Sequence, residues 1–172
     1  MDELLVMRAR AGNRRALVKL IMKRKEEFYR LSYSYMKNED DAMNMLQDLV
    51  IRLYEKLDRL KNPASFYSYS KTILVNLCKD ELARREKLIL LEDLEELGDQ
   101  AGHYEDENSL LVEEILAGLD ERQRQVIHLK YILGYDNASI ARILDIPLGT
   151  VKSRAYYGLL KLKEDCNARE IR

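Results

Sequence analysis

The sequence predicts an all-α protein made of two small helical domains. Its 172 residues include two prolines, seven glycines and no tryptophan, which leaves few turns for a many-stranded β fold. Helix-favouring residues, chiefly Leu, Lys, Glu, Arg, Ala and Met, dominate the composition. A chain of this length forms one compact domain or two small ones, and its charge pattern favours two.

The first half of the chain carries apolar residues at helical spacing. Residues 4–21 are expected to form the first helix and residues 28–35 the second. Asn38 is a candidate N-cap, because three acidic residues follow it and complement the dipole of a new helix. That third helix is long and should end near Leu60, with an apolar stripe on one side and a polar face on the other.

A proline-containing segment, Lys61-Asn62-Pro63-Ala64-Ser65, interrupts this pattern. Proline disfavours helix in the preceding residue and suits the first turn of the next helix. An exposed loop is therefore expected here, followed by a helix from about Ala64 to Glu86. Phe66 falls on the apolar side of that helix and is expected in the core.

The second half of the chain reads as three helices. Asp120 is expected to cap the first, with Gln123 three positions on in a capping-box pattern. Breaks at residues 134–136 and 145–147 separate the helices, and the last two should form a helix-turn-helix. Two short helices must share one small core, so we expect one set of apolar residues to pack against another: Ile140, Ala141 and Leu144 against Ile146, Val151, Ala155 and Leu159. The helix-turn-helix gives the second domain a candidate nucleic-acid-binding element.

Charge divides the chain more sharply than its net value of −1 indicates. Residues 1–91 carry +6, residues 92–114 carry −10 with no Lys or Arg, and residues 115–172 carry +3. Two basic modules that can approach phosphate are thus joined by a segment that cannot. The predicted domains are residues 1–90 and 110–172, joined by an acidic linker at 91–109. A solvated acidic loop between ordinary domains would give the same charges.

Several classes of protein are excluded by what the sequence lacks. It has no nucleophile, base and orienting group grouped together and no glycine-rich phosphate loop, so no enzyme is expected. Two cysteines without a CxxC pair and two histidines lack metal-ligand spacing, so neither a metal nor a cofactor is expected, and Cys78 should be a buried, inert thiol. Without an apolar run of roughly 20 residues or a secretory-type start, the chain is expected in the cytoplasm.

Polar and basic residues open the last predicted helix. In a helix-turn-helix they would project into a DNA major groove. The candidate DNA-binding residues of this recognition helix are Gly149, Thr150, Lys152, Ser153, Arg154 and Tyr157. A plain helical hairpin with solvated Lys and Arg is the alternative.

Three segments resemble the extracytoplasmic-function (ECF, group 4) sigma factors of the sigma-70 family. Residues 149–154 are similar to the family's GTVKSR-like start of the recognition helix in region 4, and residues 41–48 to the DAEDLVQE segment of region 2. The run from Phe66 through Asn76 to Arg85 is similar to a third family segment. The resemblance implies a region 2 helical bundle, a region 4 helix-turn-helix, and a subunit that directs RNA polymerase to promoters and aids DNA opening.

The resemblance also implies where the partners bind. In the family the region 2 segment grips the clamp helices of the polymerase's largest subunit. The implied polymerase-binding residues are Asp41, Asn44, Gln47, Asp48 and Arg52. Region 4 would read the minus-thirty-five element beside the polymerase flap, and an anti-sigma factor is a further expected partner.

The minus-ten element is expected to meet the proline-containing loop and the helix that follows it. Opening a duplex needs a pocket or platform for an unstacked base and cations for the backbone. The candidates are Lys61, Asn62, Ser65, Tyr67, Lys71, Asn76 and Lys79.

Two alternative functions remain open at this point. One is an autonomous helix-turn-helix regulator, whose first domain senses or dimerises while the second binds an operator. The other is a degenerate sigma-like subunit that binds polymerase without full promoter recognition. Dependence on polymerase separates the first alternative from a sigma factor.

Overall fold

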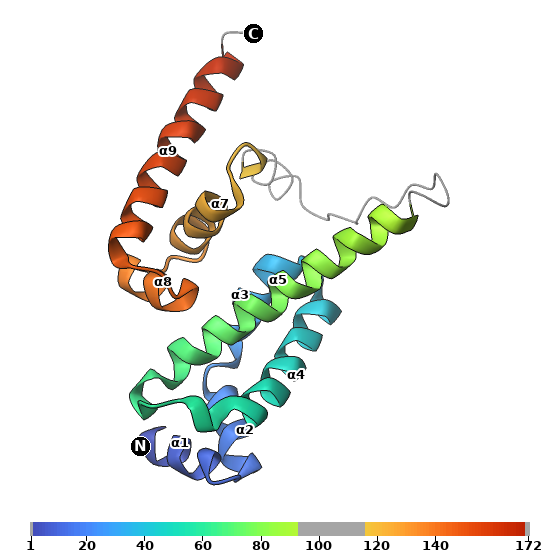
Figure 1. Cartoon of the computed structure of the whole chain (residues 1–172), viewed down its shortest axis with the longest axis vertical. Helices are drawn as coiled ribbons and strands as arrows, with labels where there is room; N and C mark the ends of the chain where they lie inside the picture. The colour runs from blue at the N-terminus through green and yellow to red at the C-terminus, as the bar shows by residue number, and fades with distance from the viewer. Residues whose placement is uncertain (1, 93–115, 171–172) are drawn as a thin grey trace. The chain divides into compact units, whose positions relative to one another are not determined.

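The computed structural model of the chain describes residues 2–92 and 116–170, and every regular element in these ranges is helical (Figure 1). The prediction of an all-α fold is confirmed. The described residues form two compact units, one on each side of residues 93–115. Most of the predicted acidic linker, 91–109, lies outside the described residues. Among the helices that are described, none has the length and apolarity needed to cross a membrane.

The first unit contains five α-helices and two short 3₁₀ turns. They are α1 (Asp2–Arg10), α2 (Arg14–Lys23), α3 (Lys25–Met36), α4 (Glu39–Lys56), η1 (Leu57–Arg59), η2 (Pro63–Ser65) and α5 (Phe66–Glu92). The single helix predicted across residues 4–21 is wrong, since the chain turns at Gly12 with φ +89°. Asn13 then caps α2 by accepting a hydrogen bond from the Ala16 amide at 3.1 Å.

Capping and composition explain the ends of α4 and α5. Asn38 accepts a hydrogen bond from the Asp41 amide at 3.0 Å, which confirms the predicted N-cap of α4. The helix α5 continues six residues beyond the predicted end at Glu86. The added residues 87–92 are Lys, Leu, Ile and Glu, with no glycine or proline to stop the helix.

The core of the first unit lies between α3, α4 and α5, which pack on one another. Phe28, Leu31, Leu49, Phe66 and Leu74 are each at most 1% exposed. Burying one such side chain contributes about 1.5–3 kcal/mol, so each of these residues stabilises the unit appreciably. The core position predicted for Phe66 is confirmed.

The second unit contains α7 (Glu121–Ile127), a π-helical turn (His128–Ile132), α8 (Asn137–Leu144) and α9 (Leu148–Glu170). Asp120 caps α7 by accepting a hydrogen bond from the Gln123 amide at 2.8 Å, as predicted. The predicted breaks at 134–136 and 145–147 are both observed, with positive φ at Gly134 and Asp145. Each break is therefore closed by a residue in the left-handed region.

The two helices α8 and α9 share the small core expected of a helix-turn-helix. Ile140, Val151 and Ala155 are at most 4% exposed, but Leu159 is 42% exposed, so its predicted core position is wrong. The cause is Gly158, which is the residue that faces α7: a Cβ there would lie 3.0 Å from Cγ1 of Ile127. With Gly158 turned to α7, the next side chain is rotated by about 100° toward solvent.

Candidate nucleic-acid interface

The turn of the helix-turn-helix is fixed by local hydrogen bonds. Asp136 caps α8 by accepting from the Ser139 amide at 2.8 Å, and this backbone hydrogen bond lowers the pKa of the Asp136 carboxyl. The amide of Ile146 donates to the carbonyl of Ala141 at 3.0 Å, and the amide of Thr150 donates to that of Pro147 at 2.9 Å. These bonds place the first turn of α9 directly after the turn.

The predicted recognition helix presents its polar residues to solvent. Gly149, Lys152 and Ser153 are exposed, and Thr150 and Arg154 are half-buried. Among the described residues, no salt bridge of Lys152 or Arg154 is recorded. Their cationic groups are therefore available to phosphate or to base edges.

Two tyrosines extend this surface along α9. Tyr156 is 63% exposed and Tyr157 is 57% exposed, and their rings meet edge to face with centroids 5.3 Å apart. Large aromatic groups this exposed are unusual on an isolated surface and suit contact with a sugar, a base or a partner side chain. Tyr157 thus joins the predicted basic residues on the exposed part of the helix.

The proline-containing loop forms η2, a single 3₁₀ turn. Asn62 caps it by accepting a hydrogen bond from the Ala64 amide at 3.0 Å, so its side-chain oxygen is already engaged. Lys61 and Asn62 are exposed and Ser65 is half-buried. Three of the predicted minus-ten residues therefore lie together on one turn.

Tyr67 follows this loop and is held by the N-terminal helix. Its hydroxyl donates to Asp2 Oδ2 at 3.2 Å, and the guanidinium of Arg24 lies over its ring at 4.1 Å from the centroid. Lys23 also forms an ion pair with Asp2. Burial and the nearby Asp2 carboxylate raise the pKa of Tyr67, whereas the Lys23 hydrogen bond leaves the pKa of Asp2 lowered.

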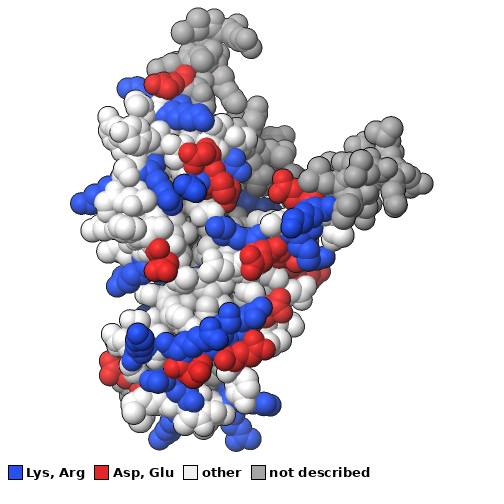
Figure 2. All heavy atoms as spheres, in the orientation of Figure 1, with Lys and Arg blue, Asp and Glu red and all other residues white. Residues whose placement is uncertain are grey.

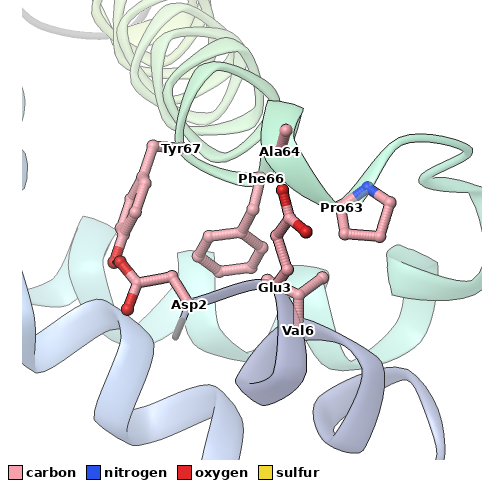
Figure 3. A pocket seen from close by; sticks show the side chains of 7 residues that line it. All are labelled: Asp2, Glu3, Val6, Pro63, Ala64, Phe66 and Tyr67. Atoms are coloured by element: carbon pink, nitrogen blue, oxygen red, sulfur yellow. The ribbon is translucent and has the colours of Figure 1, made fainter.

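A cavity of about 460 Å³ lies between the start of α1 and the loop (Figure 3). Its lining combines acids with aromatic and aliphatic surface. The lining residues are Asp2, Glu3, Val6, Pro63, Ala64, Phe66 and Tyr67. In Figure 3 the side chains of Asp2 and Tyr67 point toward each other at one side, Glu3 lies above Val6 near the middle, and Pro63 lies at the other side. Sequence reasoning identified the Pro63 side of this cavity but not its α1 side.

Lys71 differs from the other predicted minus-ten residues, because its side chain is only 10% exposed. It forms an ion pair and a hydrogen bond with Glu27 of α3. Burial alone would raise the pKa of Glu27, but the hydrogen bond and charge of Lys71 outweigh it and the pKa is lowered. In this arrangement the ammonium of Lys71 joins α5 to α3 and does not face solvent.

Asn76 and Lys79 lie further along α5, and helix geometry places them roughly 13–18 Å beyond Tyr67. Asn76 is exposed and Lys79 is half-buried. The predicted minus-ten residues therefore form two groups, one at the loop and one along the middle of α5.

The polar face of α4 is exposed as predicted. Asn44, Gln47, Asp48 and Arg52 are all exposed. A shallow groove of about 230 Å³ runs beside them and is lined by Asp48, Ile51, Arg52, Glu55 and Leu77. Ile51 is 59% exposed. Sequence reasoning missed this isoleucine, although an apolar residue between Asp48 and Arg52 on an otherwise polar face was a readable signal.

Asp41, at the start of α4, is tied to α5. Its carboxylate accepts a hydrogen bond from Arg85 at 2.7 Å, and this bond lowers the pKa of Asp41. Arg85 also bonds Glu81 at 2.7 Å, and hydrogen bonds from Arg84 and Arg85 lower the pKa of Glu81 to about 2. Asp41 is thus set apart from the fully exposed residues of the α4 face.

Two family models match most of the chain. Sigma-70 region 2 matches residues 20–88, and sigma-70 region 4 matches residues 109–162. The chain is also 30% identical over 156 residues to the RNA polymerase sigma factor SigV of Bacillus subtilis, which covers 89% of this chain and 92% of that protein. The chain belongs to the ECF sigma factors of the sigma-70 family.

Further similar proteins and solved structures are consistent with the assignment of this chain to the ECF sigma factors. The ECF sigma-E factor of Escherichia coli K12 is 28% identical over 172 residues, covering 90% of this chain and 88% of that protein. The fold is similar to that of CnrH in its solved complex with the cytosolic domain of CnrY, with a TM-score of 0.68, 23% identity and 97% coverage of both chains. The RpoE structure from Bartonella quintana, solved in complex with the anti-sigma factor NepR, gives a TM-score of 0.60 at 22% identity and covers 85% of this chain and 93% of that chain.

Family membership establishes the biochemical class. The protein is a non-enzymatic sigma factor that directs RNA polymerase to promoters. The region 2 match contains the α4 face, the η2 loop and most of α5, and the region 4 match contains α8 and the first half of α9. The alternative of an autonomous helix-turn-helix regulator is set aside by the region 2 match.

Proposed function

We propose that the two domains of this sigma factor bind different promoter elements. Residues 1–90 bind core polymerase through α4 and the minus-ten element through the η2 loop and α5. Residues 110–172 read the minus-thirty-five element through α9 beside the polymerase flap, and residues 91–109 join the two. The protein acts in the cytoplasm, where its polymerase transcribes.

The exposed face of α4 carries the polymerase part of the proposal. The groove beside its polar residues is lined by apolar Ile51 and Leu77 and by charged Asp48, Arg52 and Glu55, and a mixture of apolar and charged surface suits a protein–protein interface. We assign this face to the clamp helices of the largest subunit, with Asn44, Gln47, Asp48 and Arg52 at the rim. Asp41 contributes by positioning the start of α4 through Arg85.

A pull-down with purified bacterial core polymerase tests this assignment. Asp48→Arg places a cation where the rim carries an anion and is expected to weaken binding by at least ten-fold, about 1.4 kcal/mol. Asp58→Arg makes the same change of charge on η1, outside the groove, and is expected to bind like the unmodified protein. Equal binding by all three proteins would refute the assignment.

The exposed and positively charged side chains at the start of α9 support recognition of the minus-thirty-five element by this helix. Transcription by the reconstituted holoenzyme from promoters with intact or scrambled minus-thirty-five elements measures this recognition. Lys152→Glu is expected to lose the preference for the intact minus-thirty-five element, since a base contact contributes about 1–3 kcal/mol of discrimination. Lys161→Glu, on the same helix but more than two turns later, is expected to keep it. Loss of preference in both variants would indicate that the positive charge of α9 as a whole, and not a base contact of Lys152, is responsible for the preference.

The loop and its cavity support minus-ten recognition. An aromatic and aliphatic wall beside exposed Lys61 offers a platform for an unstacked base and a cation for its phosphate. Permanganate footprinting of opened promoter DNA should show weaker opening for Lys61→Ala and Lys79→Ala. Unchanged opening in both would favour the degenerate sigma-like alternative for this half.

Two domains that each bind DNA weakly give selectivity when both are held on one polymerase. Once one domain has bound its element, the effective concentration of the other domain at its own element rises, so affinity depends on both elements being present at the correct separation. Altering the spacer between the two promoter elements by several base pairs should abolish this gain in promoter affinity, although neither element is changed.

We also propose an anti-sigma factor as a regulatory partner. Two structural neighbours were solved with bound partners, CnrH with CnrY and RpoE with the anti-sigma factor NepR. Co-purification of a proteinaceous inhibitor that competes with core polymerase would support this proposal. Full activity of the protein purified from every growth condition would count against it.

A further inference from the structure

The α1–α2 hairpin carries a concentration of positive charge that the promoter contacts proposed above do not use. From Leu4 to Lys25 the chain has eight Lys and Arg and no Asp or Glu. Both arginines of the last turn of α1, Arg8 and Arg10, lie next to the Gly12 turn and the arginines that begin α2. In Figure 2, blue side chains edge the end of the first unit that carries α1 and α2.

Four of these eight cations are exposed and left for an external partner. Arg14 lies over the ring of Tyr54, Lys23 pairs with Asp2, Arg24 pairs with Glu27, and Lys25 is half-buried. By contrast, the four exposed cations that follow have no recorded salt bridge to any residue in the described part of the chain. They are Arg8, Arg10, Arg15 and Lys19, and they are called the basic surface here.

The basic surface works against the stability of the free protein. The first turn of α2 contains Arg14 and Arg15 and no acid, although a helix N-terminus is stabilised by negative charge and disfavours positive charge. Clustered like charges also repel one another across the turn. A bound polyanion would remove both penalties at once.

The position of the basic surface indicates which polyanion. The helix α1 packs on η2, and its first residue, Asp2, bonds Tyr67, so α1 starts at the proposed minus-ten loop. It then runs for nine residues, about 14 Å, to the Gly12 turn. Phosphates on one strand of duplex DNA rise about 3.4 Å each along the helix axis and lie further apart in an extended single strand, so a strand leaving the loop would reach Arg8 and Arg10 within about four nucleotides.

We propose that the basic surface binds the sugar-phosphate backbone of promoter DNA flanking the minus-ten element. The contact is independent of sequence, since it uses exposed, flexible Lys and Arg side chains without a pocket for a base. It lengthens the DNA path of region 2 from the η2 loop onto α1 and α2. This inference rests on the proposed minus-ten function of the loop.

The test compares holoenzymes assembled from core polymerase and either the unmodified chain or Arg15→Ala/Lys19→Ala. Both side chains are exposed on the outer face of α2, so their removal leaves the core intact. The affinity for a promoter fragment is measured as a function of salt concentration. The double variant should lower the salt slope by about 1.4 and the affinity roughly 25-fold at 0.1 M salt, taking ~0.7 counterions released per phosphate contact on a single strand.

Controls separate this inference from the function on which it rests. Arg30→Ala/Lys87→Ala removes two exposed cations from α3 and α5 and should keep the salt slope. The ratio of affinities for intact and scrambled minus-ten elements should be the same in the double variant and the unmodified protein. A holoenzyme that ignores scrambling in its unmodified form would refute the minus-ten function itself.

Two results would overturn the backbone contact while leaving the minus-ten function standing. One is an unchanged salt slope in Arg15→Ala/Lys19→Ala together with normal discrimination between intact and scrambled elements. The other is a loss of core polymerase affinity equal to the loss of DNA affinity, which would assign the basic surface to an acidic face of the polymerase.

Discussion

Removing the carboxylate of Glu27 should destabilise the first unit more than any change to a neighbouring exposed acid. Glu27 is the ion-pair partner of Lys71, whose side chain is only 10% exposed. The variant Glu27→Gln removes this carboxylate while the ammonium of Lys71 stays mostly inside the protein. Removing the carboxylate partner of a mostly buried ammonium costs free energy.

The magnitude follows from burial. Breaking a fully buried ion pair by removing one partner costs about 3–5 kcal/mol. The Glu27 side chain is 27% exposed, so water screens part of the interaction and about 2–3 kcal/mol is expected. Lys71→Met should cost less, because Arg24 at 3.3 Å still partners the remaining Glu27 carboxylate. Adding Lys71→Met to Glu27→Gln should recover about 1–2 kcal/mol.

Hydrogen exchange measured by mass spectrometry on peptides of α3 and α5 gives the free energy of opening for the first unit alone. Glu26→Gln is the matched control: the residue is an exposed neighbour on α3, and its change should cost less than about 0.5 kcal/mol. Equal effects of the two Gln variants would refute the reasoning. So would a double variant less stable than Glu27→Gln.

Acidification offers an independent check of the same pair. The pKa of Glu27 is lowered in the folded protein, so its contribution to stability is fully present above its ordinary value of 4.5. The contribution should be lost as pH falls through the lower folded value. The difference in stability between the unmodified protein and Glu27→Gln should therefore shrink below about pH 4.5 and stay constant above it.

Three further predictions concern local features. Asp136→Ala removes the N-cap of α8 and should cost about 1 kcal/mol, seen as faster exchange of α8 amides. Gly158→Val should cost about 2 kcal/mol and lower the melting temperature, because a Cβ there would lie only 3.0 Å from Cγ1 of Ile127 and valine adds two methyl groups beyond it. Burial raises the pKa of the Cys78 thiol to about 12, so iodoacetamide at pH 8 should alkylate the Cys78 peptide only after unfolding in urea.

Features set by a few neighbouring residues could be predicted from the sequence. The caps at Asn38 and Asp120 depend on one side chain and an amide three positions away, and both are present. The helix-turn-helix could be predicted for the same reason, since its turn and its apolar pairs lie within about twenty residues. The exposed polar face of α4 follows from helical periodicity alone.

Features set by contacts distant in sequence could not be predicted in this way. Lys71 reads as an exposed cation on α5, and only the approach of α3 shows that Glu27 holds it inside. Tyr67 reads as an open aromatic platform, and only the packing of α1 brings Asp2 to its hydroxyl, 65 positions away in sequence. The turn at Gly12 lies in a Gly-Asn dipeptide, which is typical of turns, but the apolar spacing on either side of it matches a single continuous helix.

These long-range contacts make the N-terminal helix part of the proposed minus-ten site. Asp2 is held by Lys23, it holds Tyr67, and Arg24 covers the ring of the same tyrosine. Three residues of α1, Asp2, Glu3 and Val6, form one wall of the cavity. A base that enters this cavity would therefore meet the carboxylate of Glu3, and at one side the ring of Tyr67 with the Asp2 carboxylate bonded to its hydroxyl. Because carboxylates accept hydrogen bonds, such a wall would favour bases that present an amino group over those that present only a carbonyl.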